Sequence, residues 1–450
     1  MIKRFPFPKC HDLRFLRPNS NGSLAVPLRR RSFWICVSFG MSLGNIFFRF
    51  PLAGQSVTLA VSDAVVAVLL FYALFRVRIA VRNSVVFAFL YFVVIVLISG
   101  ILNVTSDPTF DGYDFALDYL RLSGLLGMLV LLPTVMRRVG NELLVMGTLW
   151  AVRFHCLYFV LDTFFVMPVR WASTGVIWSP VTPEFSRPVG LFGEPSFFAV
   201  FVILSLFFVL QVEVNSKRLY IRTYDIVLIS LGLLASTALS SLVVLNCFFI
   251  ALIVTRDMKH RVRVGASATV FCVLAAVTVS TAPDIGRESM GDYMFSRAKN
   301  IRPGQFSDSS SRQRIIGSTL LAVEVLKDAP MFGKGMGGQN TNRLFLLYPE
   351  TVPARSAPLS TTIVPAQVVA SSGFLGLLAI LWVYIATVNA RRSRLMGLSF
   401  LVSLFLWGGA FEPVFWWFVC LSVAISGGQQ LRWMRKGVSR SAAAAVGPVG

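Results

Sequence analysis

Apolar segments long enough to cross a bilayer recur along almost the whole chain. A helix of about 20 residues spans the hydrocarbon core of a membrane. Of the 450 residues, 55% are apolar and only 14% are charged, and no water-facing surface can be built from that mixture. The sequence therefore predicts an all-α integral membrane protein with about 12 transmembrane helices. The expected spans are 33–50, 57–75, 84–102, 115–136, 142–166, 196–213, 225–240, 241–255, 265–282, 363–388, 395–410 and 413–428.

Positively charged residues indicate which side of the membrane each connection faces. With both termini in the cytoplasm, the twelve spans leave 27 lysines and arginines on the inner side. The short outer connections carry only Arg49, Arg170 and Arg187. Inner loops of membrane proteins are enriched in Lys and Arg, so this asymmetry supports two cytoplasmic termini. The formal net charge of +21 is therefore a signal of topology, and we expect no nucleic-acid partner.

The apolar stretch 225–255 can be divided in two ways. Its 31 residues form either one long helix or two short helices that turn at Ser236–Ser241. One helix would place Arg256–Arg263 on the outer side and spoil the charge asymmetry. We therefore expect two spans here.

The spans divide the chain into tails, helices and one large outer loop. The first 32 residues lack the apolar core and cleavage site of a signal peptide, so the first span is expected to be retained. In the large loop, Ile315–Leu326 has the apolar spacing of an amphipathic helix, and Gly333–Gly338 is expected to form a flexible turn. The predicted organisation is a basic cytoplasmic tail at 1–32, nine spans with short loops at 33–282, a large outer loop with short helices at 283–361, three spans at 362–428 and a cytoplasmic tail at 429–450.

The stretch from Arg187 to Ser196 places charged groups at the mouth of the sixth span. Its sequence is Arg-Pro-Val-Gly-Leu-Phe-Gly-Glu-Pro-Ser. Charges close to the membrane interior are costly, and they mark substrate paths or reacting sites. Glu194 stands before a proline that suits the first turn of a helix. Its carboxylate is therefore expected to act as a general base, to hold Arg187 in place, or only to cap the helix.

Arginines on the outer side are candidates for holding an anion. A guanidinium binds phosphate through two parallel hydrogen bonds and stays charged at any relevant pH. The candidates are Arg187, Arg312 and Arg314. The last two lie on nearly opposite sides of a regular helix, so only one of them is expected to face a site.

Two further arginines lie inside predicted spans, where a charge is unfavourable. Arg121 stands two turns from the outer end of the fourth span, within reach of Asp118 or of a bound phosphate. Arg153 lies within the fifth span. For both, the alternative to a functional role is structural pairing with Asp118, Asp63 or Asp162.

Histidine and cysteine positions argue against two classes of site. Two histidines are predicted to be cytoplasmic, and His155 lies within the fifth span, where we expect it to be buried and hydrogen-bonded. The outer face then has no histidine for a triad or a zinc site. The six cysteines fall in the inner tail or within spans, without metal-ligand spacing. We expect a site with no metal and no cofactor.

Three blocks of the sequence resemble the O-antigen polymerase and O-antigen ligase superfamily, most closely its exopolysaccharide polymerase branch. The first block is Arg187-x-x-Gly-x-x-x-Glu-Pro-Ser196, and the second is the Ser/Thr-rich turn Ser236–Leu242. The third combines Arg312-Gln-Arg314 with Lys327-Asp-Ala-Pro-Met-Phe-Gly-Lys-Gly335. Gly373-Phe-Leu-Gly376, at the start of the tenth span, is a further similar element.

The resemblance implies a GT-C-like membrane glycosyltransferase of the bacterial inner membrane, with its large loop in the periplasm. Members of the superfamily transfer a glycan from undecaprenyl diphosphate to an acceptor hydroxyl, without a nucleotide sugar. In this scheme Arg187 and Glu194 are catalytic, and Arg187, Arg312, Arg314 and Arg121 bind the diphosphate. The implied partners are the undecaprenyl-diphosphate-linked oligosaccharide, the lipid bilayer, and a chain-length regulator and flippase of the same pathway.

A polysaccharide polymerase is the function that this pattern favours. Ligases of the superfamily usually carry a histidine just before the tenth span, where this chain has Pro358-Leu-Ser-Thr-Thr362, so a ligase is the second reading. A flippase or other transporter would spread polar residues through many spans, whereas here they cluster on the predicted outer face. A purely structural subunit would not explain Arg121 and Arg187.

Overall fold

The computed structural model is built almost entirely of helices within the residues that it describes. Those residues are 28–43, 47–52, 55–74, 84–165, 190–192, 195–281, 292, 316–348, 364–388, 394–406 and 413–427. The helices are α1 (Leu28–Ser42), α2 (Val61–Leu74), α3 (Ser84–Ser106), α4 (Gly112–Val139), α5 (Asn141–Phe164), the 3₁₀ turn η3 (Gly190–Phe192), α7 (Pro195–Ser216), α8 (Thr223–Ala235), α9 (Leu239–Thr255), α10 (Met258–Thr281), α13 (Ser318–Asp328), α14 (Gly338–Leu347), α15 (Val364–Val388), α16 (Arg394–Leu406) and α17 (Pro413–Gly427).

Each of the twelve expected spans overlaps an apolar helix, and the tenth is interrupted at Gly373. In the described part of the chain, α3, α4, α5, α7, α10 and α15 are long and apolar enough to cross a membrane. The helices α2, α8, α9, α16 and α17 and the part of α1 from Ser32 are apolar but shorter. The predicted helical, multi-pass membrane protein is confirmed at this level. The division of 225–255 into two helices is also confirmed, because α8 ends at Ala235 and α9 begins at Leu239.

One antiparallel β-hairpin departs from the all-helical prediction. Strand β1 (Phe47–Leu52) pairs with β2 (Gln55–Ala60), and Phe47 stands opposite Ala60. The hairpin takes up the end of the expected first span and the start of the second. The sequence there combines aromatic and β-branched residues with Pro51 and Gly54, a composition that favours strands and a turn over a continuous helix.

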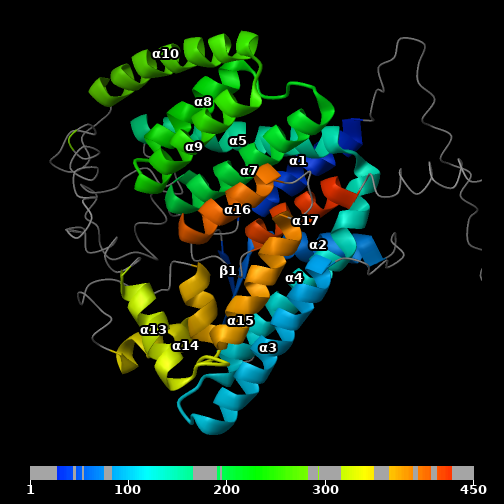
Figure 1. Ribbon diagram of the computed structural model, residues 1–450, viewed down its shortest axis with the longest axis vertical. Coiled ribbons are helices and arrows are strands. Elements are labelled where there is room, and N and C mark those ends of the chain that lie inside the picture. The colour runs from blue at the N-terminus through cyan, green and yellow to red at the C-terminus, as the bar shows by residue number, and fades with distance from the viewer. Residues whose placement is uncertain are drawn as a thin grey trace, which may run out of the picture.

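Helix α7 forms the centre of the bundle, and α10 forms one edge. Every residue of α7 from Phe198 to Leu210 is buried, as expected for a helix that is apolar on all sides. It packs against α5, α9, α16 and α17. In contrast, α10 runs along the upper edge of the bundle in Figure 1 and packs mainly on α8. Its apolar side chains, such as Val262 and Val273, are largely exposed, which suits a helix that faces lipid.

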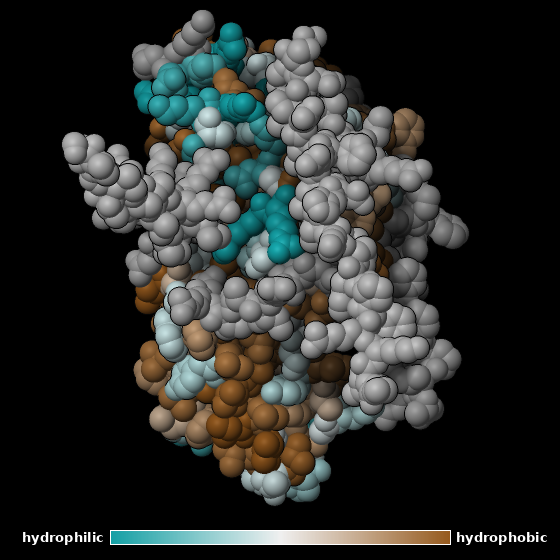
Figure 2. Space-filling view, turned by 90° about the vertical axis from the view of Figure 1, so that its right-hand side faces the viewer, coloured by the Kyte–Doolittle hydropathy of each residue, from teal (hydrophilic) through white to brown (hydrophobic). Residues whose placement is uncertain are grey.

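The surface separates into polar and apolar parts. On the face that Figure 2 shows, hydrophilic residues gather in the upper half, and hydrophobic residues cover much of the lower half. Exposed charged residues stand at the helix junctions, among them Glu142 at the start of α5 and Arg218 after α7. A membrane protein needs this separation, because charged residues belong in water and apolar flanks belong in lipid.

Helix α15 reverses direction at Gly373, which has φ 64° and ψ −159°. A side chain at Gly376 would meet Val368, and Val364 lines the same cavity as Ile380, so residues on either side of Gly373 face one another. The expected tenth span, 363–388, is therefore not one continuous helix. It meets the length needed for a span only when residues are counted through the reversal at Gly373. We call this feature the α15 hairpin (364–388).

The described part of the large loop forms two short helices beside the α15 hairpin. The predicted helix at Ile315–Leu326 is confirmed as α13, displaced by two to three residues, and it ends at Asp328 before Pro330. Helix α14 follows after the Gly333–Gly338 segment. Figure 1 shows α13, α14 and the α15 hairpin together at the end of the bundle where α3 turns into α4.

Candidate functional site

Most of the predicted site residues lie outside the described part of the chain. Arg187, Glu194, Arg312 and Arg314 belong to that group, whereas Arg121 is described. Each of the sequence blocks can nevertheless be followed in part through its described residues. In Ser236–Leu242, the Ser236 hydroxyl lies 2.6 Å from that of Ser241 at the break between α8 and α9.

The turn η3 lies on one face of α5. The backbone N–H of Gly190 donates to Asp162 Oδ2 over 3.2 Å, and both groups are buried. Gly190 has φ +60°, and a Cβ atom there would come within 2.3 Å of the ring of Phe159. The ring of Phe192 lies 4.6 Å from that of His155. His155, Phe159 and Asp162 are spaced four and three residues apart, so they follow one face of the helix. We call these three residues the α5 stripe.

His155 is buried and hydrogen-bonded, as predicted. Its Nε2 lies 2.5 Å from Ser42 Oγ, and that hydroxyl also donates to the carbonyl oxygen of Phe39. The ring of Phe39 stacks on the imidazole with 5.3 Å between centroids. These contacts join the end of α1 to α5, so the histidine has a structural role.

Arg121 pairs with aspartates in the way that one of the two alternatives predicted. Its Nη1 donates to Asp118 Oδ1 over 3.1 Å, and its Nε lies 3.7 Å from Asp63 Oδ2. Asp63 also accepts the backbone N–H of Ala60 at the end of β2. A guanidinium between two carboxylates carries no excess positive charge toward a phosphate. This geometry favours an ion-pair role for Arg121.

Arg153 pairs with a carboxylate that the sequence reasoning missed. Its Nε and Nη2 donate to the two oxygens of Asp225 over 2.7 and 3.1 Å, and Nη2 also donates to the hydroxyl of Tyr224. Asp225 is fully buried and accepts the backbone N–H of Arg222 at the start of α8. The partner lies 72 residues away in sequence. The only available signal was a lone acidic residue in the first turn of a helix.

Four backbone hydrogen bonds join the segment Ala329–Gly335 to the turn of the α15 hairpin, two donated by each partner. Lys334 and Gly335 donate their N–H groups to the carbonyls of Ala370 and Ser371, over 2.9 and 3.1 Å. In return, Phe374 and Leu375 donate to the carbonyls of Pro330 and Met331, over 2.8 and 3.2 Å. These are backbone groups that a break in a helix would otherwise leave without partners.

Two glycines allow these backbones to approach. A Cβ at Gly373 would lie 2.5 Å from the backbone of Met331, and one at Gly333 would lie 2.7 Å from the Gly373 nitrogen. Both glycines have positive φ. Ser99 and Asn103 of α3 add hydrogen bonds to the carbonyls of Ser371 and Gly333. The expected turn is present, and specific hydrogen bonds hold the backbone of its first part, Gly333–Gly335.

The acidic turn between α3 and α4 binds α14. The side chain of Asn340 accepts the N–H of Asp111 and donates to its carbonyl oxygen, over 2.9 and 3.1 Å. Asp111 itself caps α4 through the N–H groups of Tyr113 and Asp114. The carboxylate of Asp114 in turn approaches the N–H of Asn340 at 3.5 Å. These aspartates serve helix ends, so they are poor candidates for catalysis.

Arg343 completes this contact from α14. Its Nη1 lies 2.8 Å from Asp107 Oδ2 and donates to Thr109 Oγ1, and the guanidinium covers the ring of Phe110. The hydrogen bonds from Thr109, and then the charge of Arg343, lower the pKa of Asp107 below its ordinary value of 3.8. Sequence reasoning did not find Asn340 or Arg343, because a single polar residue in a loop carries no sign of a partner more than 200 residues away.

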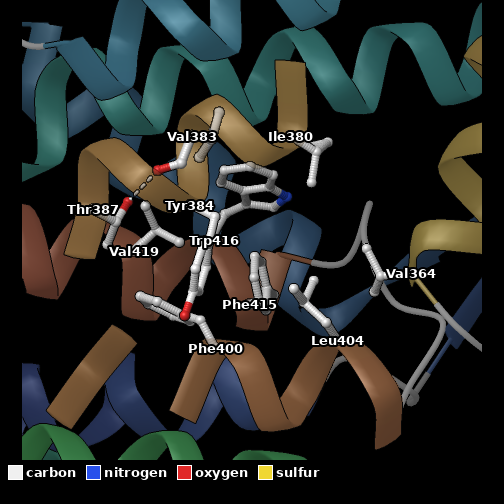
Figure 3. Close-up of a pocket in the computed structure, with 10 residues that line it drawn as sticks. All are labelled: Val364, Ile380, Val383, Tyr384, Thr387, Phe400, Leu404, Phe415, Trp416 and Val419. Atoms are coloured by element: carbon white, nitrogen blue, oxygen red, sulfur yellow. Dashed lines mark hydrogen bonds between the residues drawn. The ribbon is translucent and has the colours of Figure 1, made fainter. Parts of the chain in front are cut away.

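A small cavity between α15, α16 and α17 has no residues for acid–base chemistry apart from one tyrosine. Its volume is about 20 Å³, which is room for roughly one water molecule. Figure 3 shows apolar and aromatic side chains converging on it around Trp416. The lining residues are Val364, Ile380, Val383, Tyr384, Thr387, Phe400, Leu404, Phe415, Trp416 and Val419.

Comparison with known proteins adds no assignment. The sequence matches no protein-family model, and no curated protein is significantly similar to it. Among the described residues, no group of three or more His, Cys, Asp or Glu side chains is placed to hold a metal ion.

Proposed function

We propose that this protein is a polysaccharide polymerase of the exopolysaccharide or O-antigen type. It would transfer glycan from undecaprenyl-diphosphate-linked repeat units to an acceptor sugar hydroxyl. The observation that carries the proposal is the set of four backbone hydrogen bonds between Ala329–Gly335 and the turn of the α15 hairpin. The segments Lys327–Gly335 and Gly373–Gly376, which both carry the resemblance, are separate in the sequence but hydrogen-bonded to each other in the fold. Residues of a common site have to lie close together, and these two segments do.

The proposed reaction needs cations and one base. The acceptor oxygen attacks the anomeric carbon, the bond from that carbon to the diphosphate oxygen breaks, and the electron pair leaves with the lipid diphosphate. The acceptor proton passes to Glu194. In this proposal Arg187 and one of Arg312 and Arg314 stabilise the developing negative charge on the diphosphate. We assign Arg121 to its ion pairs with Asp63 and Asp118 instead, because those carboxylates offset its charge.

The proposed setting is the bacterial inner membrane, with both termini in the cytoplasm and the α13–α14 region in the periplasm. A membrane-impermeant thiol reagent tests this topology in intact spheroplasts of a cysteine-free variant. Leu346→Cys, at a position 75% exposed on α14, should be labelled from outside. Arg218→Cys, at a position exposed at the opposite end, should be labelled only after the membrane is opened. The reverse pattern would overturn the topology and the site with it.

A gene deletion tests the reaction class. If the protein is a polymerase, its loss should leave single repeat units on undecaprenyl diphosphate and no polymer. Full-length polymer retained on the lipid carrier would instead indicate a ligase. Repeat units that stay on the inner leaflet would indicate a flippase.

Substitutions in the deletion strain test the residues. Arg187→Lys should fail nearly as badly as Arg187→Ala, since an ammonium group cannot reproduce the planar fork. The loss should be on the order of a hundredfold in rate, about 3 kcal/mol. Glu194→Gln keeps the shape but loses the basicity, so it separates a base from a helix cap. Arg355→Ala serves as the control and should polymerise normally. Normal polymer from well-inserted Arg187→Ala would exclude the diphosphate role.

A further inference from the structure

We propose that Asp162 is a positioning residue, which holds the turn between Arg187 and Glu194 at the mouth of α7. The inference rests on the proposed function and adds to it a residue from a different part of the chain. Asp162 is fully buried near the end of α5, and its carboxylate accepts the N–H of Gly190. A buried carboxylate is unfavourable unless the surrounding groups compensate it.

The contact between Asp162 and Gly190 also requires a particular backbone conformation and a close fit. Gly190 must adopt φ +60°, which disfavours any residue with a side chain. In that conformation the ring of Phe159 fills the place where a Cβ would stand. One helical turn further along the α5 stripe, His155 contacts the ring of Phe192. The turn is thus held at both of its ends by one helix face.

The other side of the turn is held by α7. Phe192 packs against Phe198 and Phe201, with 5.6 Å between ring centroids in each case. Phe159 also stacks on Phe198 at 4.2 Å, so α5, η3 and α7 form one aromatic cluster. In the sequence, Gly190 stands three residues after Arg187 and four before Glu194. Fixing Gly190 therefore fixes the turn Gly190–Phe192, which lies in the sequence between the two proposed catalytic residues.

The test measures the position of the turn and the reaction separately. In a cysteine-free variant, Leu191→Cys reports the turn through its rate of labelling by a maleimide in isolated membranes. Asp162→Ala should increase that rate, because the turn loses its anchor. Gly190→Ala should increase it as well, since the added Cβ would meet the Phe159 ring and displace the turn from Asp162. Asp162→Asn keeps an oxygen that can accept the Gly190 N–H, so it should restore slow labelling.

Polymerisation is measured with purified lipid-linked repeat units in proteoliposomes. Asp162→Ala should lower kcat by about a hundredfold with little change in KM, since a small displacement of reacting groups can cost that much. Asp162→Asn should recover most of the loss. The control is Thr163→Val, because this neighbouring residue is similarly buried and, among the described residues, its hydroxyl bonds to the Phe159 carbonyl of its own helix alone. It should change neither measurement.

The two measurements separate the two hypotheses. Unchanged labelling in well-inserted Asp162→Ala would overturn the positioning role, whatever the reaction proves to be. Faster labelling with unchanged kcat would also overturn it, because the turn would then not matter for the chemistry. If the wild-type protein forms no polymer from the repeat units, the proposed function fails, and labelling alone still decides whether Asp162 holds the turn. If Asp162→Ala does not insert, Asp162→Asn and Gly190→Ala provide the same labelling comparison.

Discussion

The two ends of the helical bundle use carboxylates in different ways. At one end, which we call the ion-pair end, Asp225 and Glu213 pair with the guanidinium groups of Arg153 and Arg256. At the other, which we call the hairpin end, the aspartates at 107, 111 and 114 mainly serve turns and helix starts. Backbones approach one another closely there at Gly333 and Gly373. The ion-pair end therefore depends on buried charge, and the hairpin end depends on shape.

This difference predicts opposite sensitivities. Removing a charge should harm the ion-pair end most, because an unpaired buried ion is left behind. Adding a single carbon atom should harm the hairpin end most, because no space exists for it.

The largest expected loss of stability is at the ion-pair end. Glu213→Ala would leave Arg256, which is 7% exposed, without its carboxylate, and would also remove the acceptor for the Tyr220 and Ile221 N–H groups. We expect a loss of about 3–5 kcal/mol, measured as unfolding of purified protein in detergent. The double variant Glu213→Leu, Arg256→Met should recover much of this stability. A loss below about 1 kcal/mol in the single variant would contradict a charge-dependent end.

The next largest loss of stability is expected at the hairpin end. Gly373→Ala would force a Cβ to 2.5 Å from the Met331 backbone at a positive φ, so we expect a loss of about 3 kcal/mol. The matched control is Gly124→Ala in α4, where no atom lies within 4 Å of the added Cβ. That variant should be unchanged or more stable by about 0.5–1 kcal/mol. Equal stability of the two variants in a thermal melt would show that the hairpin turn is not close-packed.

A smaller loss of stability is expected at Asn340, where a side chain and not a second backbone makes the contact. Asn340 is 1% exposed and joins α14 to the α3–α4 turn through its amide group. Asn340→Ala should cost about 2 kcal/mol, because the N–H of Asp111 loses its acceptor and its carbonyl loses one of two donors, while the Phe115 N–H remains. Asn340→Asp should also be destabilising, since a carboxylate cannot donate to that carbonyl. Hydrogen exchange at the start of α4 should accelerate in both variants, and unchanged protection would exclude the contact.

The smallest expected effect is the change in stability with pH that Asp107 contributes at the hairpin end. The folded-state pKa of Asp107 lies below its ordinary value of 3.8, so its contribution is fully present above that value. It is lost as the pH falls through the lower, folded-state pKa. For a partly exposed carboxylate the contribution should be below about 1 kcal/mol. Asp107→Asn should remove this acid-dependent part and leave stability at neutral pH within the same margin. A larger change at neutral pH would show that the Arg343 contact matters more than its exposure indicates.

Local sequence pattern was sufficient to find the helices but not their partners. The two short helices in 225–255 followed from length and charge, and α13 followed from its apolar spacing. The aspartate partners of Arg121 were among those named in advance, since Asp118 lies one turn away on the same helix. Asp225 was missed for Arg153, because packing of α5 against α8 brings them together across 72 positions. No sequence period encodes such a distance.

The sequence by itself determined the membrane class, the apolar helices and the uneven charge distribution, because each follows from the cost of placing polar groups in lipid. Only the tertiary structure decided that α15 reverses at Gly373 and that the Ala329–Gly335 segment seals the break. An apolar run has the same composition whether its helix is straight or folded back. The reversal depends on a positive φ at one glycine and on backbone partners supplied from 36 and 44 residues away, and both exist only once the chain has packed.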